Sequence, residues 1–161
     1  MKKVLTLISC LWSINGLAQT CNVEILQTSS EDRFIDNKNG TVTDVVTLSI
    51  WDKCSVGQQY NEGECIGLPT PFPEWPKALE YTASTSGKRL PNIKELSTLV
   101  ERSCLEPAIN SKIFPDTPLA IYWSNTPSDS IAQSGRVIDF TDGSEFTRDV
   151  NTSFFIRLIA K

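Results

Sequence analysis

The stretch Arg89-Leu90-Pro91-Asn92-Ile93-Lys94-Glu95-Leu96 carries the clearest local folding signal in the chain. Asn92 is a preferred helix N-cap, and Glu95 stands three residues later, where its side chain can return a hydrogen bond to the cap. Apolar residues then recur at helical spacing, at Ile93, Leu96, Val100 and Cys104. The pattern predicts a helix that begins after Asn92 and ends at Cys104, with the cysteine facing the core.

Upstream of this stretch the sequence predicts one more helix. Four prolines lie between residues 69 and 76 and exclude regular structure over most of that segment. Pro76 suits the first turn of a helix, so we expect a helix over residues 75–85. Trp75, Leu79 and Ala83 would form its apolar face.

Extended segments lie on both sides of the two helices. Asn39-Gly40 stands between short extended segments and favours a two-residue hairpin turn, because both residues tolerate a positive φ. Further strands are expected over residues 48–51, 121–124, 136–140 and 154–159, with a turn at Asp142-Gly143. Together the elements indicate an α+β domain of small twisted antiparallel sheets with two helices.

The first eighteen residues have the layout of a secretory signal peptide. Lys2 and Lys3 precede an apolar run, which ends in small residues up to Ala18. The run is shorter than the roughly 20 apolar residues that span a bilayer. Residues 7–10 loosely resemble a lipobox, but too few residues precede them for a lipoprotein signal. We expect cleavage after Ala18, one extracytoplasmic domain over residues 19–161, and no membrane insertion of the mature chain.

An even number of cysteines in an exported chain predicts disulfides. Cys21, Cys54, Cys65 and Cys104 remain after cleavage and allow two bridges in three connectivities. The polar loop between Cys54 and Cys65 favours local pairing, which leaves Cys21 for Cys104. No Cys-x-x-Cys pair occurs, so a zinc site is not expected.

Composition argues against several classes of function. The chain has a net charge of −4, and the expected leader removes two lysines, so neither nucleic acid nor anionic lipid is an expected partner. Histidine is absent, which excludes Ser-His-Asp and Cys-His catalytic sites and imidazole metal ligands. We expect no enzymatic activity and no cofactor.

An ordered series of segments resembles the Lcl C-terminal domain family, and residues 89–96 correspond to its most specific motif. The other segments are residues 33–37, 40–44, Trp51 with Cys54, 107–110, 114–118, 122–124 and 155–159. The resemblance implies an extracytoplasmic bacterial domain with a C-type-lectin-like fold, related in architecture to the formylglycine-generating enzymes. The best understood members of the family act as adhesins or ligand-binding modules.

Three positions depart from the usual pattern of this family. Residues 47–51, Thr-Leu-Ser-Ile-Trp, stand in place of Thr-Gly-Leu-Met-Trp. Lys88 stands where a tryptophan commonly precedes the Arg-Leu-Pro motif, and Arg136 where another tryptophan is usual. We therefore expect the family's fold, without transfer of any member's ligand specificity.

The resemblance places ligand contacts on the segments between the late strands. C-type-lectin-like folds commonly bind ligands there, and the corresponding residues are 125–134 and 142–149. The candidate binding residues, whose polar heads can form hydrogen bonds, are Asn125, Arg136, Asp142 and Arg148. Ordinary solvated loops are the alternative for the same segments.

Two groups of residues with side-chain oxygens could suggest a metal site or a catalytic pair, but neither role is expected. Asp36, Asn39 and Asp44 do not follow the spacing of an EF-hand loop, so no metal is expected. Asp139 and Asp142 could serve as a glycosidase pair, but a turn accounts for both. A relative of the formylglycine-generating enzymes would also need late cysteines, and none follows Cys104 in the sequence.

Two arginines and the tryptophans are expected to serve the fold. Arg89 and Arg157 would tie strands and helix starts together through carbonyls or carboxylates, rather than bind anions. Trp123 would be buried, because large aromatic side chains in a small domain belong to the core more often than to a sugar site.

The sequence thus predicts an exported, non-enzymatic module that binds a glycan or a protein at the cell surface, or mediates adhesion. The alternative is a structural or assembly component of an envelope or surface apparatus.

Overall fold

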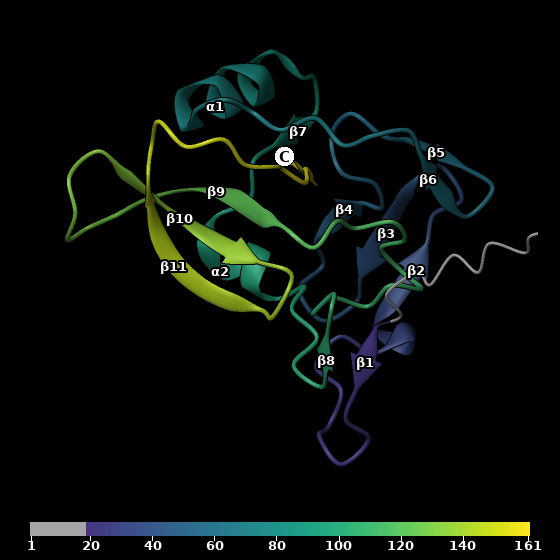
Figure 1. Cartoon of the computed structure of the whole chain (residues 1–161). Helices are drawn as coiled ribbons and strands as arrows, with labels where there is room; N and C mark the ends of the chain where they lie inside the picture. The colour runs from purple at the N-terminus through teal and green to yellow at the C-terminus, as the bar shows by residue number, and fades with distance from the viewer. Residues whose placement is uncertain (1–18) are drawn as a thin grey trace, which may run out of the picture.

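The computed structural model describes residues 19–161, and the leader expected over residues 1–18 lies outside them. The described chain has two α-helices and four small antiparallel sheets, which confirms the predicted α+β class (Figure 1). The C-type-lectin-like architecture itself stays a prediction. In chain order the elements are β1 (Thr20–Cys21), the 3-10 helix η1 (Glu31–Arg33), β2 (Phe34–Asp36), β3 (Thr41–Asp44), β4 (Ile50–Asp52), β5 (Gln59–Asn61), β6 (Glu64–Ile66), α1 (Trp75–Ser84), β7 (Lys88–Arg89), α2 (Ile93–Ser97), β8 (Cys104–Leu105), β9 (Ile121–Pro127), β10 (Ser134–Asp139), β11 (Ser144–Asp149) and β12 (Ile159–Ala160).

A five-stranded sheet joins the two ends of the domain. Its order is β2-β3-β4-β12-β7, so the last strand of the chain lies between two earlier ones. Ile159 of β12 stands opposite Trp51 on one side and Arg89 on the other. Phe34 and Val42 are buried with Trp51 and Ile159 in one apolar cluster. This sheet therefore turns one face to the core.

The three-stranded sheet β11-β10-β9 packs against both helices (Figure 1). Trp123 and Val137 lie in a buried cluster with Ala78 of α1. Tyr122, the neighbour of Trp123 on β9, lies in a second cluster with Leu96 of α2. Because neighbouring strand residues point to opposite faces, β9 contributes to both clusters. The predicted burial of Trp123 is confirmed.

Both predicted disulfides are present. Cys54 pairs with Cys65 across a sequence separation of 11, and Cys21 pairs with Cys104 across a separation of 83. The second bridge lies within the two-stranded sheet, where Cys21 of β1 stands directly opposite Cys104 of β8. Two disulfides are typical of a domain from an oxidising compartment outside the cytoplasm.

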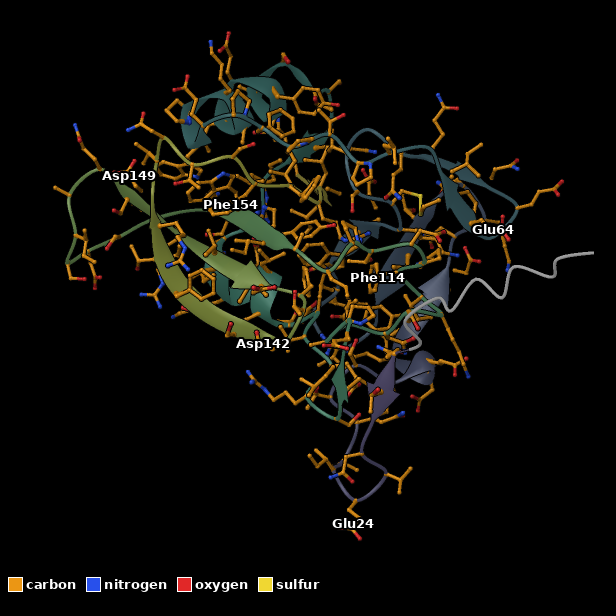
Figure 2. All side chains as sticks on the ribbon, in the orientation of Figure 1. Glu24, Glu64, Phe114, Asp142, Asp149 and Phe154 are labelled. Atoms are coloured by element: carbon orange, nitrogen blue, oxygen red, sulfur yellow. A yellow bond between two sulfur atoms is a disulfide. The ribbon has the colours of Figure 1, made fainter. Side chains whose placement is uncertain are left out.

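A single buried carboxylate holds the segment that follows β1. Glu101 is 2% exposed, and its Oε1 and Oε2 accept hydrogen bonds from the backbone N–H groups of Thr28 (3.1 Å) and Ser29 (2.7 Å). Ser103 donates to Oε1 from its backbone (3.0 Å) and its hydroxyl (2.7 Å). We call this segment, residues 22–29, the N-terminal arm. Its tip, at Glu24, projects away from the rest of the chain (Figure 2).

The predicted start of α2 is confirmed, but its predicted end is wrong. The Asn92 side chain accepts a hydrogen bond from the Glu95 N–H at 2.9 Å, and the Glu95 carboxylate accepts one from the Asn92 N–H at 2.8 Å, so the capping box is complete. Arg89 also donates twice to the Glu95 carboxylate, at 2.7 Å each, as expected for a structural arginine. The helix ends at Ser97, because the Ser97 and Thr98 hydroxyls bond to carbonyls one turn back and the chain leaves the helix there. Cys104 consequently lies on a strand, not on the helix.

The first helix forms where it is expected, and most of its expected apolar face packs against the core. α1 begins at Trp75 and has Pro76 in its first turn. Its buried residues are Ala78 and Thr82, whereas Ala83 is exposed. Trp75 and Leu79 of the expected face are partly buried against the same cluster as Ala78, so the expected face is confirmed except at Ala83.

Three strand predictions require correction. Residues 154–159, expected as one strand, contain only Ile159 of β12, and Phe154 and Phe155 form isolated bridges to Phe72 and Tyr122. The hairpin between β2 and β3 forms, but its loop spans residues 37–40, with positive φ at Lys38 (61°) and Gly40 (84°) and not at Asn39. Residues 144–149, expected as part of an exposed loop, form β11 and pair along the whole of β10. Their half-exposed, polar sequence lacks the apolar alternation by which a strand is recognised. The turn at Asp142-Gly143 is confirmed.

Candidate functional site: a polar pocket beside the Cys54–Cys65 loop

A hollow lined mainly by polar atoms lies beside the Cys54–Cys65 loop. Its volume is about 290 Å³, and residues of segments 39–41, 52–60 and 81–88 line it together with Leu158. The pocket therefore joins the start of β3, the end of β4, the end of α1 and β7. Pockets for small ligands in proteins begin at roughly this size.

An ion pair between two strands forms one side of the pocket. Lys88 Nζ lies 2.8 Å from Oδ1 and 2.7 Å from Oδ2 of Asp52. The Lys88 side chain is 39% exposed and that of Asp52 is 19% exposed, so both heads remain within reach of a ligand. The pair holds charges of both signs at the pocket without a net charge.

Tyr60 forms a second side, and its position depends on Gly40. A Cβ atom at position 40 would lie 3.1 Å from the Tyr60 Cβ, so the backbone of the β2–β3 hairpin approaches the ring closely. The buried Lys53 amine lies 4.8 Å from the centre of the Tyr60 ring and 3.4 Å from its hydroxyl. Lys53 also pairs with Asp36 at 3.2 Å. The backbone N–H of Lys38 and the amines of Lys38 and Lys53 lower the pKa of Asp36 to about 2, although partial burial opposes them.

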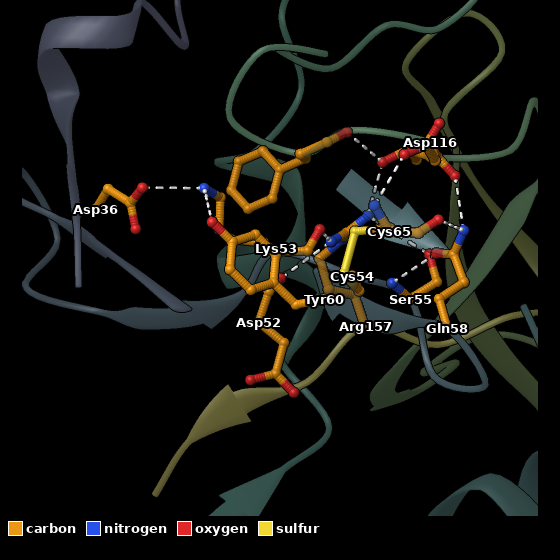
Figure 3. The surroundings of a disulfide bond; sticks show 12 residues. Asp36, Asp52, Lys53, Cys54, Ser55, Gln58, Tyr60, Cys65, Asp116 and Arg157 are labelled. Atoms are coloured by element: carbon orange, nitrogen blue, oxygen red, sulfur yellow. Dashed lines mark hydrogen bonds and ion pairs between the residues drawn. A yellow bond between two sulfur atoms is a disulfide. The ribbon is translucent and has the colours of Figure 1, made fainter. Parts of the chain in front are cut away.

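The disulfide loop itself is fixed by hydrogen bonds to a distant segment. The backbone N–H of Cys65 donates to Asp116 Oδ2 at 2.9 Å, and the Gln58 amide donates to the Asp116 carbonyl at 3.2 Å (Figure 3). Gln58 Oε1 accepts from the Ser55 N–H at 3.1 Å. With Cys54 bonded to Cys65, the wall that carries Tyr60 is held at both ends.

A fully buried arginine lies beneath this wall (Figure 3). Arg157 donates to the carbonyl of Asp52 at 2.9 Å, to the carbonyl of Lys53, and to the Thr117 hydroxyl at 2.7 Å. Its guanidinium stacks over the Phe114 ring at 5.0 Å from the centre. Burial lowers the pKa of Arg157 from its ordinary value. The expectation that Arg157 ties strands together is confirmed.

The pocket offers hydrogen-bond donors, acceptors and aromatic surface together. Asp52 accepts, Lys88 donates, and the hydroxyl groups of Tyr60, Tyr81 and Thr41 can do both. Within residues 19–161, no group of three or more His, Cys, Asp or Glu side chains could hold a metal ion. The arrangement therefore suits an uncharged ligand rich in hydroxyl groups.

The four residues predicted to bind ligand lie elsewhere and do not form one cluster. Arg136 on β10 pairs with Glu145 on β11 and lies opposite Thr147. Arg148 lies opposite Gly135, one position along, so its side chain points to the other face of the sheet. Its guanidinium stacks on its own strand neighbour Phe146, 4.0 Å from the ring centre.

Asn125 and Asp142 lie near opposite ends of the same sheet. Asn125 is exposed on β9, and its backbone N–H donates to the Pro91 carbonyl at 2.8 Å. Asp142 caps the turn between β10 and β11 by accepting from the Ser144 N–H at 2.9 Å, and the Ser144 hydrogen bonds lower its pKa. Figure 2 shows Asp142 and Asp149 at the two ends of β11. A binding role for these residues stays a prediction, without a shared site to support it.

The family model of the Lcl C-terminal domain matches residues 40–160, which is most of the described chain. The chain belongs to the Lcl C-terminal domain family. Comparison with the curated proteins gives no match. Within residues 19–161, neither helix has the length and apolar character needed to cross a bilayer.

The pocket could not be predicted from the sequence of this Lcl C-terminal domain. Its lining comes from segments separated by tens of residues, and each segment has an unremarkable local pattern. One signal was present: Lys88 occupies a position where the family commonly has tryptophan. The structure places Lys88 in the pocket wall.

Proposed function

We propose that this Lcl C-terminal domain is an exported, non-enzymatic module that binds an uncharged glycan through the polar pocket beside the Cys54–Cys65 loop. The observation that carries the proposal is the partly exposed Asp52–Lys88 ion pair, in a pocket that two tyrosines also line. A charged pair binds a sugar hydroxyl well, because the carboxylate accepts a hydrogen bond from the hydroxyl while the ammonium group donates one to its oxygen.

The size and the aromatic walls of the pocket support the same ligand class. A volume of about 290 Å³ suits a ligand of one sugar ring, with the next ring in solvent. Tyr81 is 40% exposed and Tyr60 is half-buried, so each phenol offers an apolar face with a polar tip. Such faces suit the C–H side of a sugar.

Rigidity of the pocket supports binding as well. The disulfide, the hydrogen bonds of Asp116 and the buried Arg157 hold the walls before any ligand arrives. A site held in place loses little conformational entropy on binding, which favours affinity for a small ligand.

A panel of immobilised neutral and acidic glycans, probed with the oxidised protein, tests the proposal. We expect at least one neutral glycan to bind, and Lys88→Met and Tyr81→Ser each to weaken that binding about tenfold or more, because each removes a direct contact. Lys94→Met is the matched control, since Lys94 is an exposed lysine outside this pocket.

The late-strand residues provide the competing outcome. A variant with alanine at Asn125, Arg136, Asp142 and Arg148 should bind the glycan as the unchanged protein does. Loss of binding in this variant, with full binding retained by Lys88→Met, would move the site to the late strands. Binding to acidic glycans alone would refute the proposed ligand class.

A further inference from the structure

Asparagine is followed by glycine once within residues 19–161, at Asn39-Gly40. The backbone nitrogen that follows an asparagine can attack the side-chain amide, and glycine permits this best because it has no side chain in the way. Asn39 is exposed in the loop between β2 and β3, and it lines the polar pocket beside the Cys54–Cys65 loop. A chemical change at Asn39 would therefore alter the wall of the pocket.

Both hydrogen bonds of the Asn39 side chain end at its oxygen. Oδ1 accepts from the Thr41 N–H at 3.1 Å and from the Thr41 hydroxyl at 2.7 Å. An asparagine whose oxygen bonds the N–H two residues on folds its side chain back over the intervening peptide, which here contains the Gly40 nitrogen. Two donors at one carbonyl oxygen also stabilise the negative charge that forms there when a nucleophile adds to the carbon. Thr41 thus supplies an oxyanion hole for Asn39.

Asn37 orients the Thr41 hydroxyl for this role. The Asn37 side-chain amide donates to Thr41 Oγ1 at 2.9 Å, so the hydroxyl proton is left to donate to Asn39. A hydroxyl that accepts one hydrogen bond donates a stronger one. The Asn37 backbone N–H also donates to the Thr41 carbonyl at 3.1 Å, which closes the hairpin. The two donors are therefore in place before any reaction begins.

The attacking nitrogen and the leaving group are both free. The Gly40 N–H makes no backbone hydrogen bond within residues 19–161, so no such bond has to break before it loses its proton. The Asn39 Nδ2 has no partner in the same part of the chain, and solvent can protonate it as it leaves. The Gly40 carbonyl accepts from the Lys53 N–H at 2.9 Å, which holds the loop in place. Each group that the reaction needs is thus accessible in the folded protein.

We propose that Asn39 is a site of spontaneous deamidation, promoted by the two Thr41 donors. The Gly40 nitrogen gives its proton to water and bonds to Asn39 Cγ, and the Cγ–Nδ2 bond breaks as Nδ2 takes up a proton and leaves as ammonia. Water then adds to one of the two carbonyls of the resulting succinimide. Cleavage of the new Cγ–N bond gives aspartate, and cleavage of the original backbone C–N bond gives isoaspartate. Water is the only co-reactant.

Asn110-Ser111 provides an internal comparison. Serine is also small, but both ends of the Asn110 amide are tied to the fold. Its Nδ2 donates to the Ser29 carbonyl at 2.7 Å, and its Oδ1 accepts from the Lys112 N–H at 3.1 Å. Loss of Nδ2 as ammonia would leave the Ser29 carbonyl without this donor. We expect Asn110 to stay intact while Asn39 converts.

Conversion of Asn39 would change both the charge and the shape of the pocket, a consequence that rests on the proposed function. Either product carries a carboxylate in place of a neutral amide. Isoaspartate also lengthens the backbone next to Gly40, where a Cβ atom would already lie 3.1 Å from the Tyr60 Cβ. The Tyr60 wall must then shift, so affinity for a neutral glycan should fall as the protein ages.

Peptide mapping by mass spectrometry tests the site on the oxidised protein, incubated in mildly alkaline buffer and sampled over time. Electron-transfer fragmentation separates aspartate from isoaspartate at each position. We expect Asn39 to convert about tenfold faster than Asn110 or more. Thr41→Val, which keeps the β-branched shape, should slow the conversion of Asn39 about tenfold in the folded protein, because one of the two donors is lost. It should have no effect in the reduced chain unfolded in urea.

Thr43→Val is the matched control, since Thr43 is half-buried on the same face of β3 and its hydroxyl bonds Asn37 instead of Asn39. Thr43→Val should leave the rate unchanged, as should Thr41→Ser, which keeps the hydroxyl. An intact Asn39 throughout, or an equal rate in Thr41→Val and the unchanged folded protein, would overturn the proposal. An effect of Thr41→Val that persists in urea would overturn it too, because the folded donors would not be its cause.

The consequence for the pocket has a separate readout. The deamidated fraction, separated by anion exchange through its added charge, should bind the neutral glycan about tenfold more weakly than the unchanged fraction. Equal binding of the two fractions would overturn this consequence. The mass-spectrometric result is measured without any glycan, so failure of the proposed function and failure of the modification site are distinguishable.

Discussion

The carboxylate of Glu101 offers the sharpest test of how the N-terminal arm is held. The change is Glu101→Gln, which preserves the shape of the side chain and removes its charge. In the folded protein Oε1 accepts three hydrogen bonds, one from Thr28 and two from Ser103, and Oε2 accepts one from Ser29. The glutamine amide has only one oxygen, so its NH₂ group must face at least one backbone N–H.

The cost follows from those contacts. With the amide oxygen in the place of Oε1, the Ser29 N–H loses its acceptor, and an unsatisfied buried donor costs about 1–3 kcal/mol. The three remaining hydrogen bonds lose the assistance of a full negative charge, which costs a further fraction of a kcal/mol each. We therefore expect the free energy of unfolding to fall by about 3 kcal/mol.

Urea unfolding at pH 7, followed by tryptophan fluorescence with the disulfides intact, measures the difference. Glu24→Gln is the matched control, because Glu24 is exposed at the tip of the same arm and should change the free energy by less than about 0.5 kcal/mol. A loss under about 1 kcal/mol in Glu101→Gln would refute the reasoning, since it would mean that the buried carboxylate is not needed to satisfy these donors.

The same pair of proteins should also differ in pH dependence. Burial raises the pKa of Glu101, but the hydrogen bonds from Ser103, Ser29 and Thr28 outweigh it, so the pKa in the folded state is lowered. A lowered carboxyl pKa stabilises the fold above the unfolded value of about 4.3, and this contribution is lost as the pH falls through the folded pKa. The gap between the unchanged protein and Glu101→Gln should therefore be constant near pH 7 and narrow below about pH 4.

Two further changes test the support of the pocket. Arg157→Met removes the side chain that donates to the carbonyls of Asp52 and Lys53 beneath the Cys54–Cys65 loop. It should lower the free energy of unfolding in urea by about 3–5 kcal/mol, whereas a loss below about 1 kcal/mol would contradict a structural role. Replacing Cys54 and Cys65 together with serine should lower the free energy of unfolding by about 3 kcal/mol in the same assay. It should also weaken glycan binding, because the loop that carries Tyr60 gains conformational freedom. Unchanged glycan binding would show that the loop does not form the site.

Local side-chain chemistry explains which elements could be predicted from sequence. The capping box of Asn92 and Glu95 acts within one turn, so its pattern alone locates the start of α2. The end of the same helix depends on a competition between helical propagation and the hydroxyls of Ser97 and Thr98, which the apolar spacing does not register. The predicted helix is therefore correct where local signals act and too long where they compete.

The candidate site, in contrast, could not be predicted from local sequence patterns. Asp52 and Lys88 are 36 residues apart, and only the insertion of β12 between β4 and β7 brings their strands into one sheet. No local pattern encodes that insertion. The predicted binding residues do not form one site for the same reason. Residues 144–149 form a strand, and the alternation of its side chains places Arg148 on a different face from Arg136.

The Cys21–Cys104 bridge has a mechanical consequence for the domain. Tension applied at residues 19 and 161 passes through the sulfur–sulfur bond, so the residues between Cys21 and Cys104 bear none of it. With a sequence separation of 83, this shortcut withholds roughly 300 Å of contour length from stretching. The pocket walls contributed by β3, β4 and the Cys54–Cys65 loop lie inside the shielded segment. The load falls instead on the strands after Cys104. Among them is β12, which lies between β4 and β7, so its detachment would separate Asp52 from Lys88 and open the pocket.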